Sequence, residues 1–268
     1  MRASVLIDPE RPKVKRAEVV STLRDAGFRV TESNPDIGVV VGGDGAFSDY
    51  GRRISVPLLF VGVRSAEPTA SKGYLSEVRF DRLKDALEKI NSKRYSVVEH
   101  KRLAVAINGE AKGEIFTDVY LEKGAESNCL RYHLDVKGKG IQFTDSAIAN
   151  GVIICTSAGS TGYYSYIDRL GKGERLEADR FTRIGENEVG VCHIAPVLTA
   201  RDHGGESPLR YTVPWGSSFR LRLTRDADAR LYGTVRSRNG IRVRVGDSID
   251  VRPSSNHTRV IRLRSDSA

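Results

Sequence analysis

Two glycine-rich segments, far apart in the chain, carry side chains that suit phosphate chemistry. Gly42-Gly43-Asp44-Gly45 follows an apolar run at residues 37–41, and Gly159-Ser160-Thr161-Gly162 comes much later. Glycines let successive backbone N–H groups converge on an anion. An aspartate among them would repel a bare phosphate, so its presence indicates that it binds Mg²⁺, accepts a proton from an attacking hydroxyl, or does both. The pair of segments therefore predicts phosphoryl transfer.

Each segment also has a purely structural interpretation. An Asp-Gly pair such as Asp44-Gly45 is common in β-hairpin turns, and Ser160 and Thr161 would suit the start of a capped helix. Two other nucleotide-binding motifs do not fit. The first apolar run is not followed by the three spaced glycines of a dinucleotide-binding fingerprint, and no glycine loop ends in Gly-Lys-Ser or Gly-Lys-Thr. Hydride transfer on a standard Rossmann domain and P-loop chemistry are therefore disfavoured.

The elements that must position these segments change in character along the chain. Strand and helix patterns alternate at first, in the order strand 3–7, helix 13–26, strand 28–30, strand 37–41, strand 56–63 and helix 80–90. Beyond residue 94, short runs separated by glycine, asparagine and charged residues are typical of antiparallel strands, apart from a helix expected over residues 160–170.

This order predicts an α/β domain followed by an all-β domain. The Rossmann-like α/β domain would cover residues 1–94 and contain the Gly-Gly-Asp-Gly segment, and the β-rich domain would cover residues 95–255. Residues 256–268 form a C-terminal segment that could return to the first domain.

Composition sets broad limits on the class of protein. The chain has 268 residues and 39% hydrophobic content, which is enough for one large domain or two modest ones. Cys129, Cys155 and Cys192 fit neither a disulfide framework nor a zinc site, so we expect them to be reduced and buried. No run of about 18 apolar residues is present. We therefore expect a cytoplasmic protein that has no membrane partner.

The formal charge of +9 would attract polyanions. Arginine alternates with apolar residues in two segments, Phe219-Arg220-Leu221-Arg222-Leu223 and Ile241-Arg242-Val243-Arg244-Val245, which is the pattern of half-buried strands. Much of the positive charge therefore has a structural explanation, and nucleic acid is not an expected partner.

The two glycine segments, in this order and at this separation, resemble the NAD kinase family. That family pairs a Gly-Gly-Asp-Gly loop with a later Thr-Pro-Thr-Gly-Ser-Thr-Ala-Tyr segment, and residues 156–163 here read Thr-Ser-Ala-Gly-Ser-Thr-Gly-Tyr. The likeness extends to residues 56–62, 231–234 and 245–249. It implies an α/β domain, a β-sandwich domain that binds a dinucleotide, and ATP-dependent phosphorylation of the adenosine ribose 2′-hydroxyl of NAD to give NADP.

The resemblance also implies roles for individual residues. Asp44 would be the catalytic base or the carboxylate coupled to Mg²⁺, and Gly42, Gly43 and Gly45 would wrap the ATP phosphates. The positions implied to bind the dinucleotide are Thr117, Asp118, Asn150, Ser157, Ser160, Thr161 and Tyr163. Mg²⁺ and ATP would be required, with polyphosphate as an alternative donor, and the chain would form a homodimer or homotetramer.

Two alternatives remain open at this point. Thr117-Asp118 stands where the family has an Asn-Glu pair, and Asn150 stands where it has an acidic residue. A kinase of the same fold could therefore use another acceptor, such as a nucleoside, a sugar or a lipid. A noncatalytic nucleotide-binding protein is the second alternative.

Overall fold

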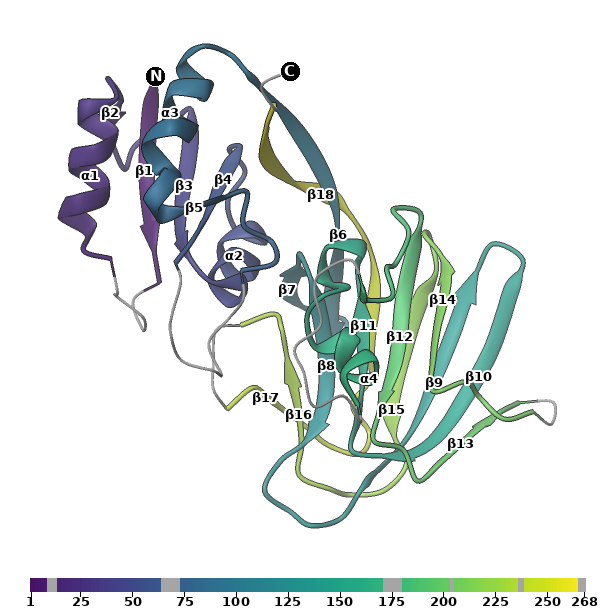
Figure 1. The fold of residues 1–268 in the computed structure, drawn as a ribbon. Coiled ribbons are helices and arrows are strands. Elements are labelled where there is room, and N and C mark those ends of the chain that lie inside the picture. The colour runs from purple at the N-terminus through teal and green to yellow at the C-terminus, as the bar shows by residue number, and fades with distance from the viewer. Residues whose placement is uncertain (9–13, 64–72, 171–179, 203–204, 236–238, 265–268) are drawn as a thin grey trace. The chain divides into compact units, whose positions relative to one another are not determined.

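A computed structural model describes residues 1–8, 14–63, 73–170, 180–202, 205–235 and 239–264. The chain forms two compact units, one of Met1–His100 with His257–Ala268 and one of Lys101–Asn256 (Figure 1). Residues 265–268 of the C-terminal segment lie outside the described residues. The chain passes from one unit to the other within β6 (Tyr95–Ile107) and again within β18 (Ile249–Leu263).

The first unit is built on a parallel sheet. Its strands are β1 (Arg2–Ile7), β2 (Arg29–Val30), β3 (Ile37–Gly42), β4 (Leu58–Gly62) and β5 (Val78–Arg79). Its helices are α1 (Arg16–Asp25), α2 (Asp44–Gly51), η1 (Phe80–Arg82) and α3 (Leu83–Asn91). The sheet runs in the order β2-β1-β3-β4, and β4 also pairs with β5 and, through Val260 opposite Leu58, with the end of β18.

Different helices cover the two faces of this sheet. The apolar sides of α1 and α3, including Leu23 and Leu87, pack with Val39 and other inward residues in one buried cluster (Figure 1). Because side chains alternate along a strand, Phe60 points to the opposite face. There its ring stacks on Phe47 of α2, with centroids 4.7 Å apart and an interplanar angle of 10°. This contact anchors α2 and with it the first turn that carries Asp44.

The second unit is a β-sandwich. Its strands, besides parts of β6 and β18, are β7 (Glu110–Ile115), β8 (Asp118–Lys123), β9 (Leu130–Gly138), β10 (Ile141–Ala149), β11 (Gly151–Cys155), β12 (Glu188–Ile194), β13 (Leu198–Arg201), β14 (Arg210–Pro214), β15 (Ser218–Leu223), β16 (Ala229–Tyr232) and β17 (Ile241–Val243). One sheet has the order β7-β6-β18-β15-β9-β10-β13 and the other β14-β12-β11-β8-β16-β17. Inward residues of both sheets form one apolar cluster.

The predicted fold class, α/β followed by a β-sandwich, is confirmed. The arginine-rich run of β15 alternates between exposed and buried positions as expected. Cys129, Cys155 and Cys192 are free, and the latter two are buried. None of the helices in the described part of the chain has the length and apolar character needed to cross a membrane.

One structural alternative is excluded and one local prediction was wrong. Asp44 does not lie in a hairpin turn, because it begins helix α2. Residues 160–170 are not one helix but two short turns and a single helical turn: η2 (Ser157–Gly159), η3 (Tyr163–Ser165) and α4 (Tyr166–Arg169). The hydroxyls of Ser160 and Ser165 each donate to the carbonyl three residues earlier, at 2.7 Å. Such side-chain bonds compete with regular helix, so the segment folds into successive tight turns.

Candidate active site

Asp44 lies directly after the carboxyl end of β3, at the edge where parallel sheets usually bind ligands. Gly43 precedes it in an extended conformation, with φ −119° and ψ −176°. Gly42 is needed for packing, because a Cβ there would lie 2.9 Å from the Cβ of Ala46 and 3.4 Å from that of Asp8. Strand β3 therefore delivers Asp44 to this edge through a turn that a larger residue would disturb.

Two backbone amides fix the Asp44 carboxylate. Oδ2 accepts a hydrogen bond from the N–H of Tyr74 at 3.1 Å, and Oδ1 accepts one from the N–H of Leu75 at 2.9 Å. These two bonds hold the Asp44 carboxylate in one orientation.

Gly45 has no packing role in the described structure. It is exposed, a Cβ at this position would meet no atom within 4 Å, and its φ lies outside the left-handed region. Glycine in a helix destabilises it by about 1 kcal/mol relative to alanine. The fold therefore gives no reason for a glycine here, whereas close approach of a ligand to the backbone would.

In the second unit, Asp118 begins β8 and Thr117 precedes it, next to the segment of residues 156–163, called here the serine-rich turn. The Thr117 hydroxyl donates to Oδ1 of Asp118 at 2.9 Å. The carbonyl of Thr117 accepts hydrogen bonds from both the N–H and the hydroxyl of Thr156, at 2.8 and 3.0 Å. A Cβ on Gly159 would lie 2.6 Å from that carbonyl oxygen and 2.5 Å from Sγ of Cys155. The turn thus packs directly on the Thr117-Asp118 backbone.

Burial raises the pKa of Asp118 from its ordinary value of 3.8 to about 6, although hydrogen bonds from Thr117 and from the Tyr163 N–H oppose this effect. Because the pKa is higher in the folded state, Asp118 contributes stability below about pH 4. That contribution is lost as the pH rises through about 6.

Asp118→Asn should therefore stabilise the second unit at high pH but not at low pH. A pKa change of this size corresponds to about 3 kcal/mol, and residual solvent contact reduces it, so we expect about 1–2 kcal/mol at pH 8. Near pH 4 the protonated carboxyl and the amide should be nearly equivalent. Urea unfolding at both pH values measures the difference, and an equal effect at both would contradict the assignment.

The hydroxyls of the serine-rich turn differ in their hydrogen bonding. Ser160 is 0% exposed, and its Oγ donates to the Ser157 carbonyl at 2.7 Å and accepts from the Ile184 N–H at 3.0 Å. Its hydroxyl is therefore engaged inside the protein. The hydroxyls of Ser157 and Thr161 have no hydrogen-bond partner among the residues that the structure describes. The Thr161 carbonyl accepts a hydrogen bond from the guanidinium of Arg169 at 2.9 Å, which links the turn to α4.

Tyr163 joins an aromatic group that the sequence reasoning missed. Its hydroxyl donates to Glu122 at 2.9 Å, and its ring meets that of Tyr120 edge to face, with centroids 5.2 Å apart. Tyr120 stacks on Tyr232, with centroids 5.1 Å apart. The available signal was strand periodicity, because Asp118, Tyr120 and Glu122 lie two residues apart on β8 and so share a face.

Asn150 lies between β10 and β11, where the chain leaves one sheet of the sandwich and enters the other. Its N–H donates to the Ile194 carbonyl and its carbonyl accepts from the Lys123 N–H, both at 2.8 Å. In the pairing of β11 with β8, Gly151 lies opposite Glu122 and Cys155 opposite Asp118. Asn150 and Asp118 are therefore at opposite ends of one strand pair.

The predicted site residues thus form distinct groups. Thr117, Asp118 and the segment from Ser157 to Tyr163 are in mutual contact in the second unit, and Asn150 lies at the far end of the β8–β11 pair. Asp44 and its glycines belong to the first unit.

Sequence comparison assigns the family. Over 238 residues the chain is 30% identical to an NAD kinase of Geobacter sulfurreducens, which covers 86% of this chain and 74% of the relative. An NAD kinase of Magnetococcus marinus is 30% identical over 234 residues, covering 84% and 68% of the two chains. The chain belongs to the NAD kinase family. The resemblance that rested on two glycine segments is thereby confirmed, although no family model matches the chain.

Solved structures of NAD kinase family members show the same fold. A yeast NADH kinase complexed with NADH superposes with a TM-score of 0.71 at 15% identity, covering 99% of this chain and 84% of the other. An NAD kinase of Archaeoglobus fulgidus in complex with ATP gives a TM-score of 0.67 at 17% identity, covering 99% and 94%. Both comparisons agree with the two-part architecture described above.

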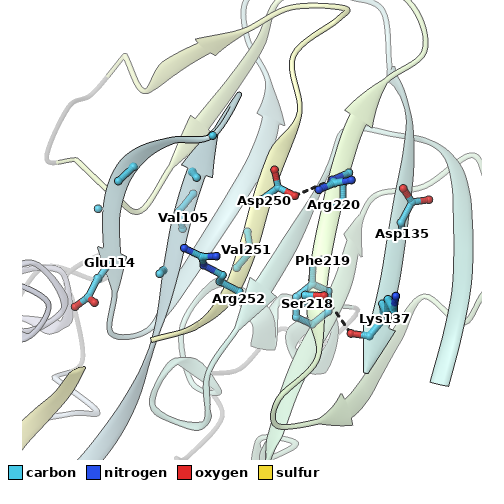
Figure 2. Close-up of a pocket in the computed structure, with 15 residues that line it drawn as sticks. Val105, Glu114, Asp135, Lys137, Ser218, Phe219, Arg220, Asp250, Val251 and Arg252 are labelled. Carbon is cyan, nitrogen blue, oxygen red and sulfur yellow. Dashed lines mark hydrogen bonds and ion pairs between the residues drawn. The ribbon is translucent and has the colours of Figure 1, made fainter. Parts of the chain in front are cut away.

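A hollow of about 730 Å³ in the second unit is separate from the residues that the NAD kinase resemblance selects. Figure 2 shows it on the face of the sheet formed by β7, β6, β18, β15 and β9. Arg220 pairs there with Asp250 at 2.8 Å, and Arg222 pairs with the neighbouring Asp135. These pairs balance charge locally, so the hollow lacks the concentrated positive charge that a nucleotide phosphate would require.

Proposed function

We propose that this chain transfers the γ-phosphoryl group of ATP to the adenosine ribose 2′-hydroxyl of NAD, giving NADP. The observation that carries the proposal is 30% identity to an NAD kinase over 86% of the chain. The structure supports it because the carboxylate of the Gly-Gly-Asp-Gly segment stands at the ligand-binding edge of the first sheet, with its orientation fixed by two amides.

In this proposal Asp44 acts on the acceptor hydroxyl. Its carboxylate would orient the 2′-hydroxyl and accept its proton as the oxygen attacks phosphorus, while the bond to the leaving ADP oxygen breaks. Gly42, Gly43 and Gly45 would let the backbone approach the transferred phosphate closely.

Mg²⁺ fits this site as an ion that arrives with ATP. Kinase Mg²⁺ is commonly held by one or two carboxylates together with substrate phosphates. Asp44 supplies a suitable carboxylate, and among the described residues no group of three acidic, histidine or cysteine side chains forms a ready-made metal site. When bound, the ion would neutralise charge on the ATP phosphates. Polyphosphate remains an alternative donor, to be compared with ATP under the same conditions.

In the second unit we assign dinucleotide contacts to the hydroxyls of Ser157 and Thr161, which are not engaged within the described protein. Tyr163 would offer its ring, and Asn150 its amide, to the dinucleotide. Ser160 and Thr117 would contribute indirectly, because their hydroxyls support the turn and Asp118. Asp118 would contact the ligand from the base of the turn.

A panel of acceptors tests the proposal directly. The purified chain is incubated with Mg²⁺ and ATP, and with NAD, NADH, a nucleoside, a sugar or a diacylglycerol, and products are identified by mass. We expect one added phosphoryl group on NAD, located on the adenosine ribose. Phosphorylation of another acceptor alone, or NAD binding without product, would overturn the proposal in favour of the corresponding alternative.

The same proposal includes a homodimer or homotetramer, as the family resemblance implies, and a location in the cytoplasm. Sedimentation velocity at several concentrations measures the oligomeric state, and fractionation of the source cells measures the location. A monomer at all concentrations would remove the oligomer from the proposal without affecting the reaction.

Gly45→Ala should weaken ATP binding without weakening the fold. Because the position is open and lies in a helix, the substitution should leave the free energy of unfolding unchanged or raise it by up to about 1 kcal/mol. The added methyl group should obstruct the phosphate and raise KM for ATP about tenfold or more. Steady-state kinetics and urea unfolding measure the two effects. An unchanged KM for ATP would show that phosphate does not approach Gly45.

A further inference from the structure

A row of polar side chains crosses the core of the second unit, and the proposed reaction does not use it. Asp145 on β10 and His193 on β12 are each 0% exposed, and Tyr132 on β9 is 1% exposed. His193 alternates with Val189 and Val191, which belong to the sandwich core, so its ring points between the two sheets. Three adjacent polar groups in an apolar core must satisfy one another.

The contacts within the row are specific. Nδ1 of His193 lies 2.7 Å from the hydroxyl oxygen of Tyr132, and that hydroxyl donates to the carbonyl of Gly151 at 2.9 Å. Nε2 of His193 lies 3.7 Å from Oδ2 of Asp145. Arg201 binds both oxygens of Asp145, at 2.8 and 3.2 Å.

The Tyr132 hydroxyl links the histidine to the backbone. It donates to the Gly151 carbonyl and lies within hydrogen-bond distance of Nδ1 of His193, so it contacts both groups at once. Nε2 of His193 has no hydrogen-bond partner in the described structure, and it faces Oδ2 of Asp145.

The groups around His193 keep fixed charge states. Burial raises the pKa of Asp145, but its interactions with His193, Arg201 and Tyr211 outweigh this effect and hold the pKa below its ordinary value, so Asp145 is an anion. Burial raises the pKa of Tyr132 and Tyr211, so both remain neutral.

The remaining neighbours of His193 contact other parts of the residue. Tyr166 of α4 donates to the backbone carbonyl of His193, at 2.6 Å, and so does not compete for the ring. Cys192 belongs to the apolar cluster on the opposite face of β12. Asp145, Arg201, Tyr132 and Tyr211 are therefore the titratable or charged groups of the described structure that face the ring or its carboxylate partner.

Tyr132, at one end of the row, contacts the chain next to Asn150. The turn at Asn150-Gly151, between β10 and β11, is called here the Asn150 corner. Gly151, whose carbonyl Tyr132 holds, follows Asn150 directly and begins β11. The corner tolerates little adjustment, because a Cβ on Gly151 would lie 2.0 Å from the carbonyl oxygen of Leu121. A change in the Tyr132 bond would therefore be transmitted to the peptide units on either side of Gly151.

We propose that Asp145, His193 and Tyr132 are positioning residues: Asp145 and His193 hold the Tyr132 hydroxyl in place, and that hydroxyl fixes the Asn150 corner for dinucleotide binding. The inference rests on the proposed function through the assigned contact of Asn150. Loss of the Tyr132 hydroxyl would release the Gly151 carbonyl.

Tyr132→Phe removes the hydroxyl and keeps the ring. We expect KM for NAD to rise about five- to tenfold, with kcat within about twofold and KM for ATP unchanged. Tyr50→Phe is the matched control, since it also removes one hydroxyl bond to a backbone carbonyl, that of Ile7 at 2.9 Å. It should leave KM for NAD unchanged.

A measurement that needs no substrate separates this inference from the proposed function. In protein labelled with ¹⁵N, Tyr132→Phe should shift the side-chain amide resonance of Asn150, and Tyr50→Phe should not. An Asn150 signal unaffected by Tyr132→Phe would overturn the inference even if NAD is phosphorylated. If NAD is not turned over, these spectra still decide whether the row controls the corner.

Discussion

Asp44→Asn should lower the rate of NAD phosphorylation by about 10²–10⁴-fold, the usual consequence of losing a general base. The amide can neither take the proton of the 2′-hydroxyl nor balance the charge of Mg²⁺. It can still accept one of the two backbone hydrogen bonds, from Tyr74 or Leu75. We therefore expect the variant to fold, with a free energy of unfolding lower by about 1–3 kcal/mol. The loss of rate should appear in kcat. Single-turnover kinetics and calorimetric titration with NAD measure rate and affinity separately.

Asp85→Asn is the charge-matched control for that variant. Asp85 lies on α3, its side chain is 59% exposed, and it pairs only with Arg82 in the described structure. It should leave kcat and the NAD affinity unchanged. Turnover of Asp44→Asn within tenfold of the parent would remove Asp44 from the chemical step.

Gly159→Ala should disrupt the second unit and its dinucleotide site together. The new Cβ would lie 2.5 Å from Sγ of Cys155 and 2.6 Å from the carbonyl oxygen of Thr117, and neither is the free end of a flexible side chain. Overpacking of this kind typically costs 1–3 kcal/mol. Because the Thr117 contact is with the backbone, we expect the free energy of unfolding to fall by about 3 kcal/mol. Because relief requires the turn to move away from Thr117 and Asp118, affinity for NAD should fall at least tenfold even where the unit remains folded. Thermal unfolding and calorimetry measure both quantities.

Gly205→Ala provides the comparison for steric crowding. A Cβ at Gly205 would meet no atom within 4 Å, and the residue lies outside the left-handed φ region. The substitution should change neither stability nor affinity by a measurable amount. If Gly159→Ala behaves like Gly205→Ala, the turn does not depend on close packing against β8.

Local sequence patterns were sufficient to predict these helices and strands and to indicate the family. Apolar spacing in α3, with Leu83, Leu87 and Ile90 all buried, predicted a helix against a sheet, and alternation in β15 predicted a half-buried strand. Gly27 follows the end of the first helix with φ +80°, a conformation that suits glycine. These features depend on residues close together in sequence, which is why sequence alone was informative about them.

Features that depend on contacts between residues far apart in the sequence could not be predicted from it. The engagement of the Ser160 hydroxyl by the Ile184 N–H joins residues 24 positions apart, so nothing near Ser160 indicates that it faces inward. The same is true of Asp44, whose amide partners come from residues 74 and 75. His193 has no charged neighbour in sequence that explains its burial, since Tyr132 and Asp145 reach it only through the sandwich.

The return of β18 to the first unit has a consequence for biosynthesis. Val260 pairs with Leu58, the Thr258 hydroxyl donates to the carbonyl of Gly51, and Glu77 binds Arg262. These contacts cannot form until the last strand has been translated, although the first hundred residues emerge from the ribosome much earlier. At roughly 5–20 residues per second the nascent sheet would wait roughly 10–30 s with Leu58 unpaired on the side of β4 that later meets β18. Chaperones that shield exposed strand edges should therefore engage the N-terminal half during synthesis and release it only after β18 has emerged.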